Sequence, residues 1–297
     1  MWKTVVAFAK LGRPLFLTGG FVNYALGVAV ARLSGHAIDL RRYVLGQAAV
    51  TAFQLMTHYA NDYFDLEADR ANTTPTRWSG GSRVLPGGEL PRVAALIAAL
   101  VLAAIGLLLI AVLREEMFVL VAMAVLAWAY SAPPLRLCAS GLGELDTAVV
   151  VTGLVPWLGF ALQAPDLRGA TVLLAAIAPA VLLQFAMLLA IEFPDADGDA
   201  ATGKRTLVVR LGASTAAKLY AACTAAAYLW LPIAWRLGVP AIAVLLAALA
   251  FPIAVWRIAR IADHCDRAAH ERIAFFAVAQ VVGVAAAMLA GVAITAM

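Results

Sequence analysis

Long apolar segments limit what this chain of 297 residues can fold into more than any other feature of its sequence. A membrane-spanning helix needs about 20 apolar residues, and lipid accepts only helices or closed barrels, whose strands are far shorter. Nine apolar segments lie between polar breaks: 15–33, 43–61, 91–113, 116–130, 143–163, 170–192, 214–236, 238–258 and 273–295. The segment 116–130 is short, and Pro133-Pro134 marks where it must end. The sequence predicts an all-α integral membrane protein with nine transmembrane helices in a single domain, residues 1–297.

The composition supports this fold class. Hydrophobic residues make up 64% of the chain and charged residues only 13%, whereas a soluble domain is about one quarter charged. The formal net charge of +4 is typical of basic loops held at the inner side of a membrane, so we expect no nucleic-acid partner. The three cysteines, Cys138, Cys223 and Cys265, are scattered without metal-binding spacing and are interpreted as structural thiols.

The distribution of Lys and Arg predicts the orientation. If the N-terminus is cytoplasmic, 16 of the 22 basic residues fall on the cytoplasmic side and 6 on the other. The positive-inside rule therefore places the N-terminus in the cytoplasm and the C-terminus outside, in the cell (inner) membrane. Two cytoplasmic loops, 62–91 and 195–213, are longer and more polar than the rest, and each begins with acids and then turns basic. This shared order hints at a weak duplication of helices 1–4 in helices 5–8.

Each of these loops opens with oxygen-bearing side chains at helical spacing. The members are Asn61, Asp65 and Asp69 in the first cluster and Glu192, Asp195 and Asp199 in the second. Spacings of i, i+4, i+8 and of i, i+3, i+7 place each set on one helix face. Stacked carboxylates repel one another unless cations lie between them, and Mg²⁺ is the natural occupant because it binds one or two carboxylates together with phosphate oxygens.

Basic residues follow both clusters and suggest what the metal would bind. Arg70, Arg77 and Arg83 follow the first, and Lys204 and Arg205 follow the second. Metal-binding carboxylates ringed by Lys and Arg form a pocket suited to a diphosphate. A departing diphosphate leaves a carbocation, so the remaining cavity should be apolar, aromatic and dry.

Several motifs resemble those of the UbiA superfamily of intramembrane prenyltransferases. NDYFDLEAD resembles the family's NDxxDxxxD motif, and DADGD matches its second DxxxD motif. RPLFL, YSAPPLRL and the following GLGE look like further family segments. GKRTLVVRLG is similar to the version in the 1,4-dihydroxy-2-naphthoate prenyltransferases of menaquinone synthesis. The resemblance covers nearly the whole chain.

The resemblance implies a nine-helix bundle around a central cavity, with a cytoplasmic cap made by the two long loops. It implies Mg²⁺-dependent transfer, with two ions expected, of a polyprenyl group from an isoprenyl diphosphate to an aromatic acceptor such as 1,4-dihydroxy-2-naphthoate. Its metal residues carry over to Asn61, Asp65, Asp69, Asp195 and Asp199, its diphosphate contacts to Arg13, Arg77, Arg83, Arg136 and Lys204, and its catalytic residues to Asp65, Asp195 and Tyr130.

Two departures from the family pattern leave the acceptor open. Glu192-Phe193-Pro194-Asp195 stands where naphthoate-type members have Asn-x-Arg-Asp, and the loop SGGSRVLPGGEL differs from the Pro-Arg-Pro-rich version of several subfamilies. Prenyl length and oligomeric state are also not fixed by the sequence.

Two other functions are compatible with the same residues. A membrane terpene cyclase would use the same diphosphate site but let double bonds of the prenyl chain attack. An ion-coupled transporter would carry its acids near the bilayer midplane, whereas these clusters lie at segment ends. Glu144 and Asp146 enter the fifth segment and can meet the cavity, although GLGE is equally compatible with a plain helix start.

Overall fold

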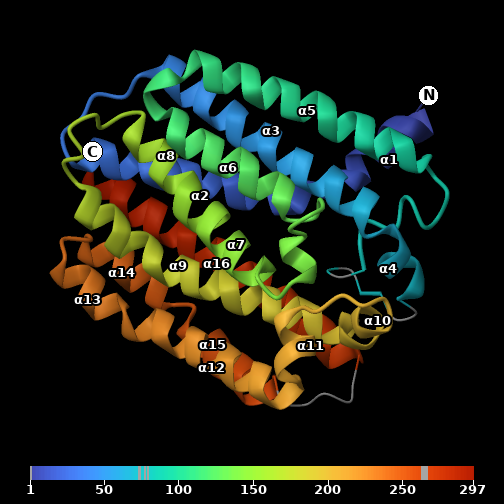
Figure 1. Ribbon diagram of the computed structural model, residues 1–297. Helices are drawn as coiled ribbons and strands as arrows, with labels where there is room; N and C mark the ends of the chain where they lie inside the picture. The colour runs from blue at the N-terminus through green and yellow to red at the C-terminus, as the bar shows by residue number, and fades with distance from the viewer. Residues whose placement is uncertain (1, 73–74, 77, 79, 262–266) are drawn as a thin grey trace.

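The protein is built from α-helices, with no β-strand among the described residues (Figure 1). The computed structural model describes residues 2–72, 75–76, 78, 80–261 and 267–297. The helices of ten residues or more are α1 (Trp2–Leu11), α2 (Pro14–Leu33), α3 (Leu40–Phe64), α5 (Arg92–Val112), α6 (Met117–Ala129), α9 (Ala170–Glu192), α12 (Ala213–Leu229), α15 (Phe251–Arg260) and α16 (Arg267–Thr295). The shorter helices are α4 (Leu66–Ala71), α7 (Gly143–Val149), α8 (Val155–Ala161), α10 (Ala196–Ala201), α11 (Leu207–Leu211), α13 (Leu231–Arg236) and α14 (Ala241–Ala248).

All nine apolar segments contain helix, which confirms the predicted all-α class. Among the described residues, six helical stretches are long and apolar enough to cross a membrane: Pro14–Leu33, Arg92–Val112, Gly143–Ala161, Ala170–Ala201, Ala241–Arg260 and Ala268–Thr295. Among the other three segments, α3 carries polar residues such as Gln47, Gln54 and His58, and α6 has only 13 residues. The segment 214–236 is divided at Trp230, where α12 ends and α13 begins. The count of nine crossings remains a prediction.

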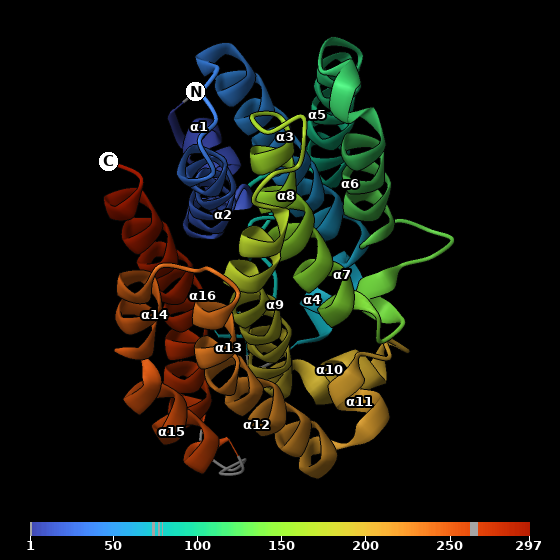
Figure 2. The same ribbon diagram turned by 90° about the vertical axis from the view of Figure 1, so that its left-hand side faces the viewer.

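The helices pack so that the two acidic loops meet at one end of the bundle. Helix α16 packs against α2, α9 and α14, and α3 packs against α5 and α6 (Figure 2). The N-terminus, α4, α10 and α11 lie at one end, and the C-terminus lies at the other (Figure 1). Helices α4 and α10, which carry the last acid of each cluster, are in contact there. Chain segments far apart in the sequence therefore form a common polar end.

At the other end, α2 and α8 approach each other through glycine. A Cβ atom at Gly27 would lie 1.9 Å from the carbonyl oxygen of Pro156, and one at Gly159 would lie 2.3 Å from the carbonyl oxygen of Tyr24. Only glycine allows two helix backbones to come this close, as is common between membrane helices. The crossing fixes α2 against α8 through main-chain atoms.

Candidate active site

The first acidic motif spans a bend between two helices. Helix α3 ends at Phe64, and Asp65 (φ −93°, ψ 7°) joins it to α4. The backbone bonds continue across the bend, because the Asp65 N–H donates to the Asn61 carbonyl at 2.8 Å and the Asp69 N–H donates to the Asp65 carbonyl at 2.9 Å. The amide of Asn61 donates to the Asp65 carboxylate at 2.9 Å and to the Ser131 hydroxyl at 3.1 Å.

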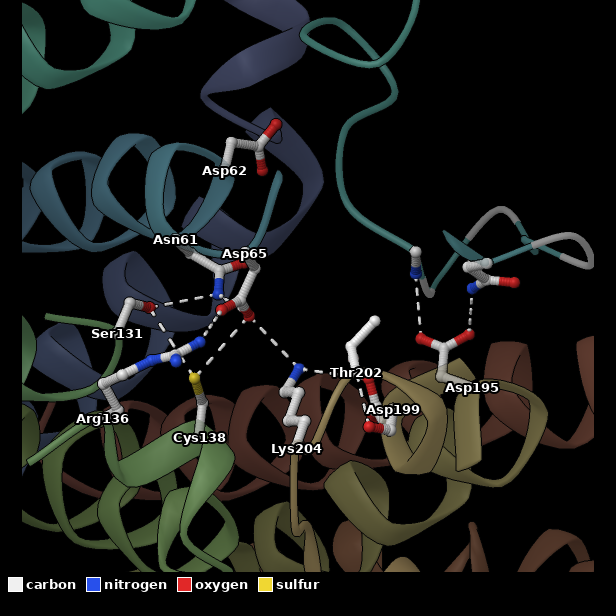
Figure 3. A network of polar contacts seen from close by, with 12 residues as sticks. Asn61, Asp62, Asp65, Ser131, Arg136, Cys138, Asp195, Asp199, Thr202 and Lys204 are labelled. Carbon is white, nitrogen blue, oxygen red and sulfur yellow. Dashed lines mark hydrogen bonds and ion pairs between the residues drawn. The ribbon is translucent and has the colours of Figure 1, made fainter. Parts of the chain in front are cut away.

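Asp65 lies at the centre of a network of polar contacts at this end of the protein (Figure 3). Its carboxylate is only 4% exposed. In addition to the hydrogen bond from Asn61, the Oδ2 atom accepts from Lys204 Nζ at 3.2 Å and from Cys138 Sγ at 3.7 Å. The Oδ1 atom lies 3.5 Å from a guanidinium nitrogen of Arg136. The predicted site residues Asn61, Asp65, Arg136 and Lys204 are therefore brought together. Cys138, interpreted from sequence as a structural thiol, contacts the central carboxylate.

Lys204 connects the two acidic motifs. Its ammonium lies between Asp65, at 3.2 Å, and Asp199, at 3.6 Å (Figure 3). Burial opposes the charge on Lys204, but Asp65, with Cys138 and Asp199 contributing, holds the pKa of its ammonium well above the ordinary value. A cation thus lies between carboxylates that would otherwise repel each other.

Asp195 faces away from this cluster. Helix α9 ends at Glu192, and a 3₁₀ turn over Phe193–Asp195 directs the Asp195 carboxylate to the first loop. There it accepts from the Asn72 side-chain amide at 2.7 Å and from the Gly80 N–H at 3.0 Å (Figure 3). The prediction that Glu192, Asp195 and Asp199 share one helix face stays a prediction. The contacts of Asp195 join the second motif to the loop that follows the first.

Asp69 contributes a buried carboxylate beside the loop. It is 8% exposed, and its Oδ2 has no hydrogen-bond partner among the described residues. The loop approaches it through Gly81 (φ 74°), where a Cβ atom would lie 2.0 Å from Asp69 Oδ2. Burial raises the pKa of Asp69 to about 7, against the opposing effect of Arg13. The guanidinium of Arg83 donates to the main-chain carbonyl of Asp69.

Arg13 and Asp62 form a second ion pair at the same end. Arg13 has a left-handed backbone (φ 45°) just before α2. Its guanidinium pairs with Asp62 and donates to Asn61 Oδ1 at 3.2 Å. Asp62 is 1% exposed and also accepts from the Ser82 hydroxyl. Asp62 belongs to the motif NDYFDLEAD but was not among the predicted metal or diphosphate residues. Its position next to Asn61 is the signal that marks it as part of the site.

A cavity extends from these motifs into the bundle. Arg13, Asn61 and Tyr130 line it at the motif end, and residues such as Phe53 and Val281 line it farther in. Tyr130 therefore lies at the cavity, and its predicted catalytic role stays a prediction. Arg77, also predicted to bind diphosphate, lies outside the described residues.

Glu144 fixes the segment that carries Lys204. It is 1% exposed on α7, and its Oε1 accepts from the main-chain N–H of Leu207, the first residue of α11, at 2.8 Å. It was one of two acids left open by the sequence, and in this structure it holds α11.

Replacing Glu144 by Ala is expected to loosen this attachment. A buried N–H left without a partner costs about 1–3 kcal/mol, so Glu144→Ala should lower the unfolding temperature and speed amide exchange at Leu207. Glu144→Gln keeps an acceptor oxygen and should stay closer to the unchanged protein. Equal exchange at Leu207 in all three proteins would contradict the role given to Glu144.

The acidic residues fit a hard divalent cation that is completed by a ligand. No group of three or more His, Cys, Asp or Glu converges as a ready-made metal site within the described ranges. The motifs do supply buried oxygens without hydrogen-bond partners among those residues, Asp65 Oδ1 and Asp69 Oδ2. Mg²⁺ is commonly held by one or two carboxylates, with water and substrate phosphate as the other ligands.

Comparison with known proteins identifies the family of the chain. The profile of the UbiA prenyltransferase family matches residues 21–280. The 1,4-dihydroxy-2-naphthoate octaprenyltransferase of Bacillus subtilis (strain 168) is 25% identical over 229 residues, which cover 74% of this chain and 71% of that protein.

Solved structures share the fold. The UbiA homologue of Archaeoglobus fulgidus bound to DMAPP and Mg²⁺ gives a TM-score of 0.67 at 16% identity, covering 93% of this chain and 98% of that one. The apo UbiA homologue of Aeropyrum pernix K1 gives 0.69 at 20% identity, covering 91% and 97%. The chain is a membrane transferase and belongs to the UbiA prenyltransferase family.

Proposed function

We propose that the protein transfers a polyprenyl group from an isoprenyl diphosphate to an aromatic quinone precursor such as 1,4-dihydroxy-2-naphthoate, with Mg²⁺ as cofactor. The observation that carries the proposal is the convergence of Asp65, Asp199 and Lys204 beside Asn61, which lines the cavity, although Asp65 and Lys204 lie 139 residues apart in the chain. The Bacillus subtilis relative is named for a naphthoate acceptor, which supports this class of acceptor.

The donor set suits a metal-bound diphosphate. Asn61, Asp65, Asp69, Asp195 and Asp199 would hold Mg²⁺, and we expect two ions. When bound, Mg²⁺ neutralises charge that develops on the leaving diphosphate. The Archaeoglobus fulgidus homologue is described as bound to DMAPP and Mg²⁺, which supports the same pairing here.

The basic residues would bind the diphosphate while the cavity encloses the prenyl group. Lys204 and Arg136 already contact Asp65, and Arg13 lines the cavity. In this proposal they bind the phosphate oxygens, and Arg83 contributes from the loop. Tyr130 would lie near the reacting carbon, where an aromatic face stabilises positive charge. The apolar walls would exclude water.

Removal of divalent cations is expected to stop prenyl transfer. Chelation with EDTA would leave the carboxylates facing a diphosphate of the same charge, so donor binding and bond cleavage should both fail. Mg²⁺ added in excess of the chelator should restore turnover, measured as prenylated product. Full turnover in EDTA would contradict the metal role.

A product assay tests the function itself. Purified protein would be given isoprenyl diphosphates of several lengths with naphthoate, benzoate or homogentisate acceptors, and also with no acceptor. A prenylated aromatic product is expected. A cyclic hydrocarbon formed without an acceptor would instead favour the terpene cyclase.

The topology in the membrane is part of the proposal. Nine crossings in one domain, with the N-terminus cytoplasmic and the C-terminus outside the inner membrane, would give the two loops a common cytoplasmic side as a cap. The opposite positions of the termini (Figure 1) support this arrangement. Protease digestion of a C-terminal tag in oriented vesicles tests it, because the tag should be cut only from the outer face.

A further inference from the structure

Polar side chains that are not part of the acidic motifs also line the cavity. They are Asn23 on α2, Gln54 on α3, Asp146 on α7 and Gln184 on α9. Asn23 is 1% exposed and Asp146 is 8% exposed. Within the described part of the chain, Asn23 Oδ1, Gln54 Oε1 and Asp146 Oδ1 are buried without a hydrogen-bond partner. Unpaired polar atoms inside a membrane protein are unfavourable and mark functional positions.

The local packing limits where two of these groups can point. The Gln54 side chain lies against Gly20, where a Cβ atom would come 2.0 Å from Gln54 Oε1. The Asn23 amide donates to the Gly19 carbonyl at 2.8 Å, which leaves its Oδ1 unused. A Cβ atom at Gly19 would lie 3.9 Å from Val151, in the π-helical segment that follows α7. Such π-helical turns are frequent at functional sites.

Neither part of the proposed donor satisfies these groups. A prenyl chain has no polar atom to pair with them, and a diphosphate would be repelled by the Asp146 carboxylate. Three unpaired oxygens instead call for a ligand with O–H donors. A hydroxyl group both donates and accepts, so it suits the amide oxygens and either protonation state of Asp146.

We propose that Asn23, Gln54 and Asp146 form a subsite for the hydroxyl groups of the aromatic acceptor, an inference that rests on the proposed function. The subsite favours a ring with two hydroxyl groups over a ring with one, because two hydroxyls pair two of the oxygens. Arg13 is the only Lys or Arg among the described residues that line the cavity, and it lies at the motif end. A carboxylate on the acceptor is therefore directed toward Arg13, and the hydroxyl groups toward Asp146.

Binding measurements with matched ligands test the subsite. The probes are 1,4-dihydroxy-2-naphthoate, 1-hydroxy-2-naphthoate and 2-naphthoate, titrated against the full-length protein in lipid nanodiscs. Loss of a hydroxyl should weaken binding to the unchanged protein about tenfold or more. Asp146→Leu and Gln54→Met should bind the dihydroxy ligand about tenfold more weakly and should discriminate less among the three.

The chain offers a control on the same helix. Gln47 is also buried on α3 with an unpaired Oε1, but it does not line the cavity. Gln47→Met should therefore keep the unchanged protein's affinities. Thermal unfolding adds a second readout, because replacing an unpaired polar group by an apolar one should maintain or raise the unfolding temperature of the ligand-free protein. A purely structural role for Asp146 or Gln54 would lower it.

The outcomes separate the subsite from the proposed function. Unchanged affinity and unchanged discrimination in Asp146→Leu and Gln54→Met would overturn the subsite, whether or not the protein transfers prenyl groups. Hydroxyl-dependent binding that is lost in these variants would support the subsite. If that loss occurred while the unchanged protein prenylated no aromatic acceptor, the proposed function would fail and the subsite would stand.

Discussion

Asp65→Asn is expected to lower prenyl transfer by roughly 10²- to 10³-fold, the scale of losing a pre-organised electrostatic contact in an active site. One oxygen of the Asp65 carboxylate accepts hydrogen bonds from Asn61, Lys204 and Cys138. The other oxygen lies 3.5 Å from a guanidinium nitrogen of Arg136. Asparagine keeps the size of the side chain but removes the negative charge that holds these groups and would hold Mg²⁺. Turnover would be measured as prenylated product at saturating donor and acceptor.

Glu67→Gln provides the matched control. Glu67 lies two residues from Asp65 in the same motif, but its side chain is 69% exposed and pairs with Arg70 at the surface. Exposed pairs of this kind contribute little to stability, so this variant should retain full activity. Thermal unfolding of both variants shows whether the fold is kept. A fully active Asp65→Asn protein would refute the prenyl-transfer site.

Lys204→Met is expected to produce the second large effect, on both stability and turnover. Without the ammonium, the carboxylates of Asp65 and Asp199 face each other with no cation between them. Removing one partner of a buried ion pair costs about 3 kcal/mol or more. The variant should unfold at a lower temperature in EDTA, and product formation should fall because one diphosphate contact is lost.

Mg²⁺ should compensate part of the Lys204→Met defect in stability. A divalent cation can neutralise the same two carboxylates, so the rise in unfolding temperature on adding Mg²⁺ should be larger in the variant than in the unchanged protein. Lys218→Met, at an exposed position on α12, should behave like the unchanged protein. Equal Mg²⁺ shifts in Lys204→Met and Lys218→Met would contradict the expectation that Mg²⁺ neutralises the carboxylates of Asp65 and Asp199.

The sequence predicted those parts of the fold that depend only on the polarity of the side chains. The nine apolar segments are all helical because lipid and a bundle interior impose the same requirement on each. The internal breaks were not predictable in the same way. The division of 214–236 at Trp230 and the π-helical turn at Val150–Leu154 interrupt continuous apolar runs. These breaks depend on contacts with neighbouring helices, and the periodicity of apolar residues along one segment carries no information on such contacts.

The site was predictable in its residue types and less so in its contacts. Spacing indicated that Asn61 and Asp65 would meet, and they do. Spacing could not indicate that Asp195 would bind Asn72 and the Gly80 N–H, because that contact depends on how a loop folds back over 115 residues or more of sequence. Cys138 illustrates the same limit, since nothing in its own neighbourhood shows that Asp65 lies beside it.

The close contact between α2 and α8 at Gly27 and Gly159 limits how the length of the accepted prenyl tail can change in evolution. Asn23 and Val155 line the cavity just before the crossing, and beyond them Gly27 meets the main chain of Pro156. A wall made of backbone cannot be moved outward by trimming a side chain. Selection for longer or shorter prenyl tails would therefore have to act on walls built from side chains, where residues such as Phe53, Met187 and Val281 can change in size.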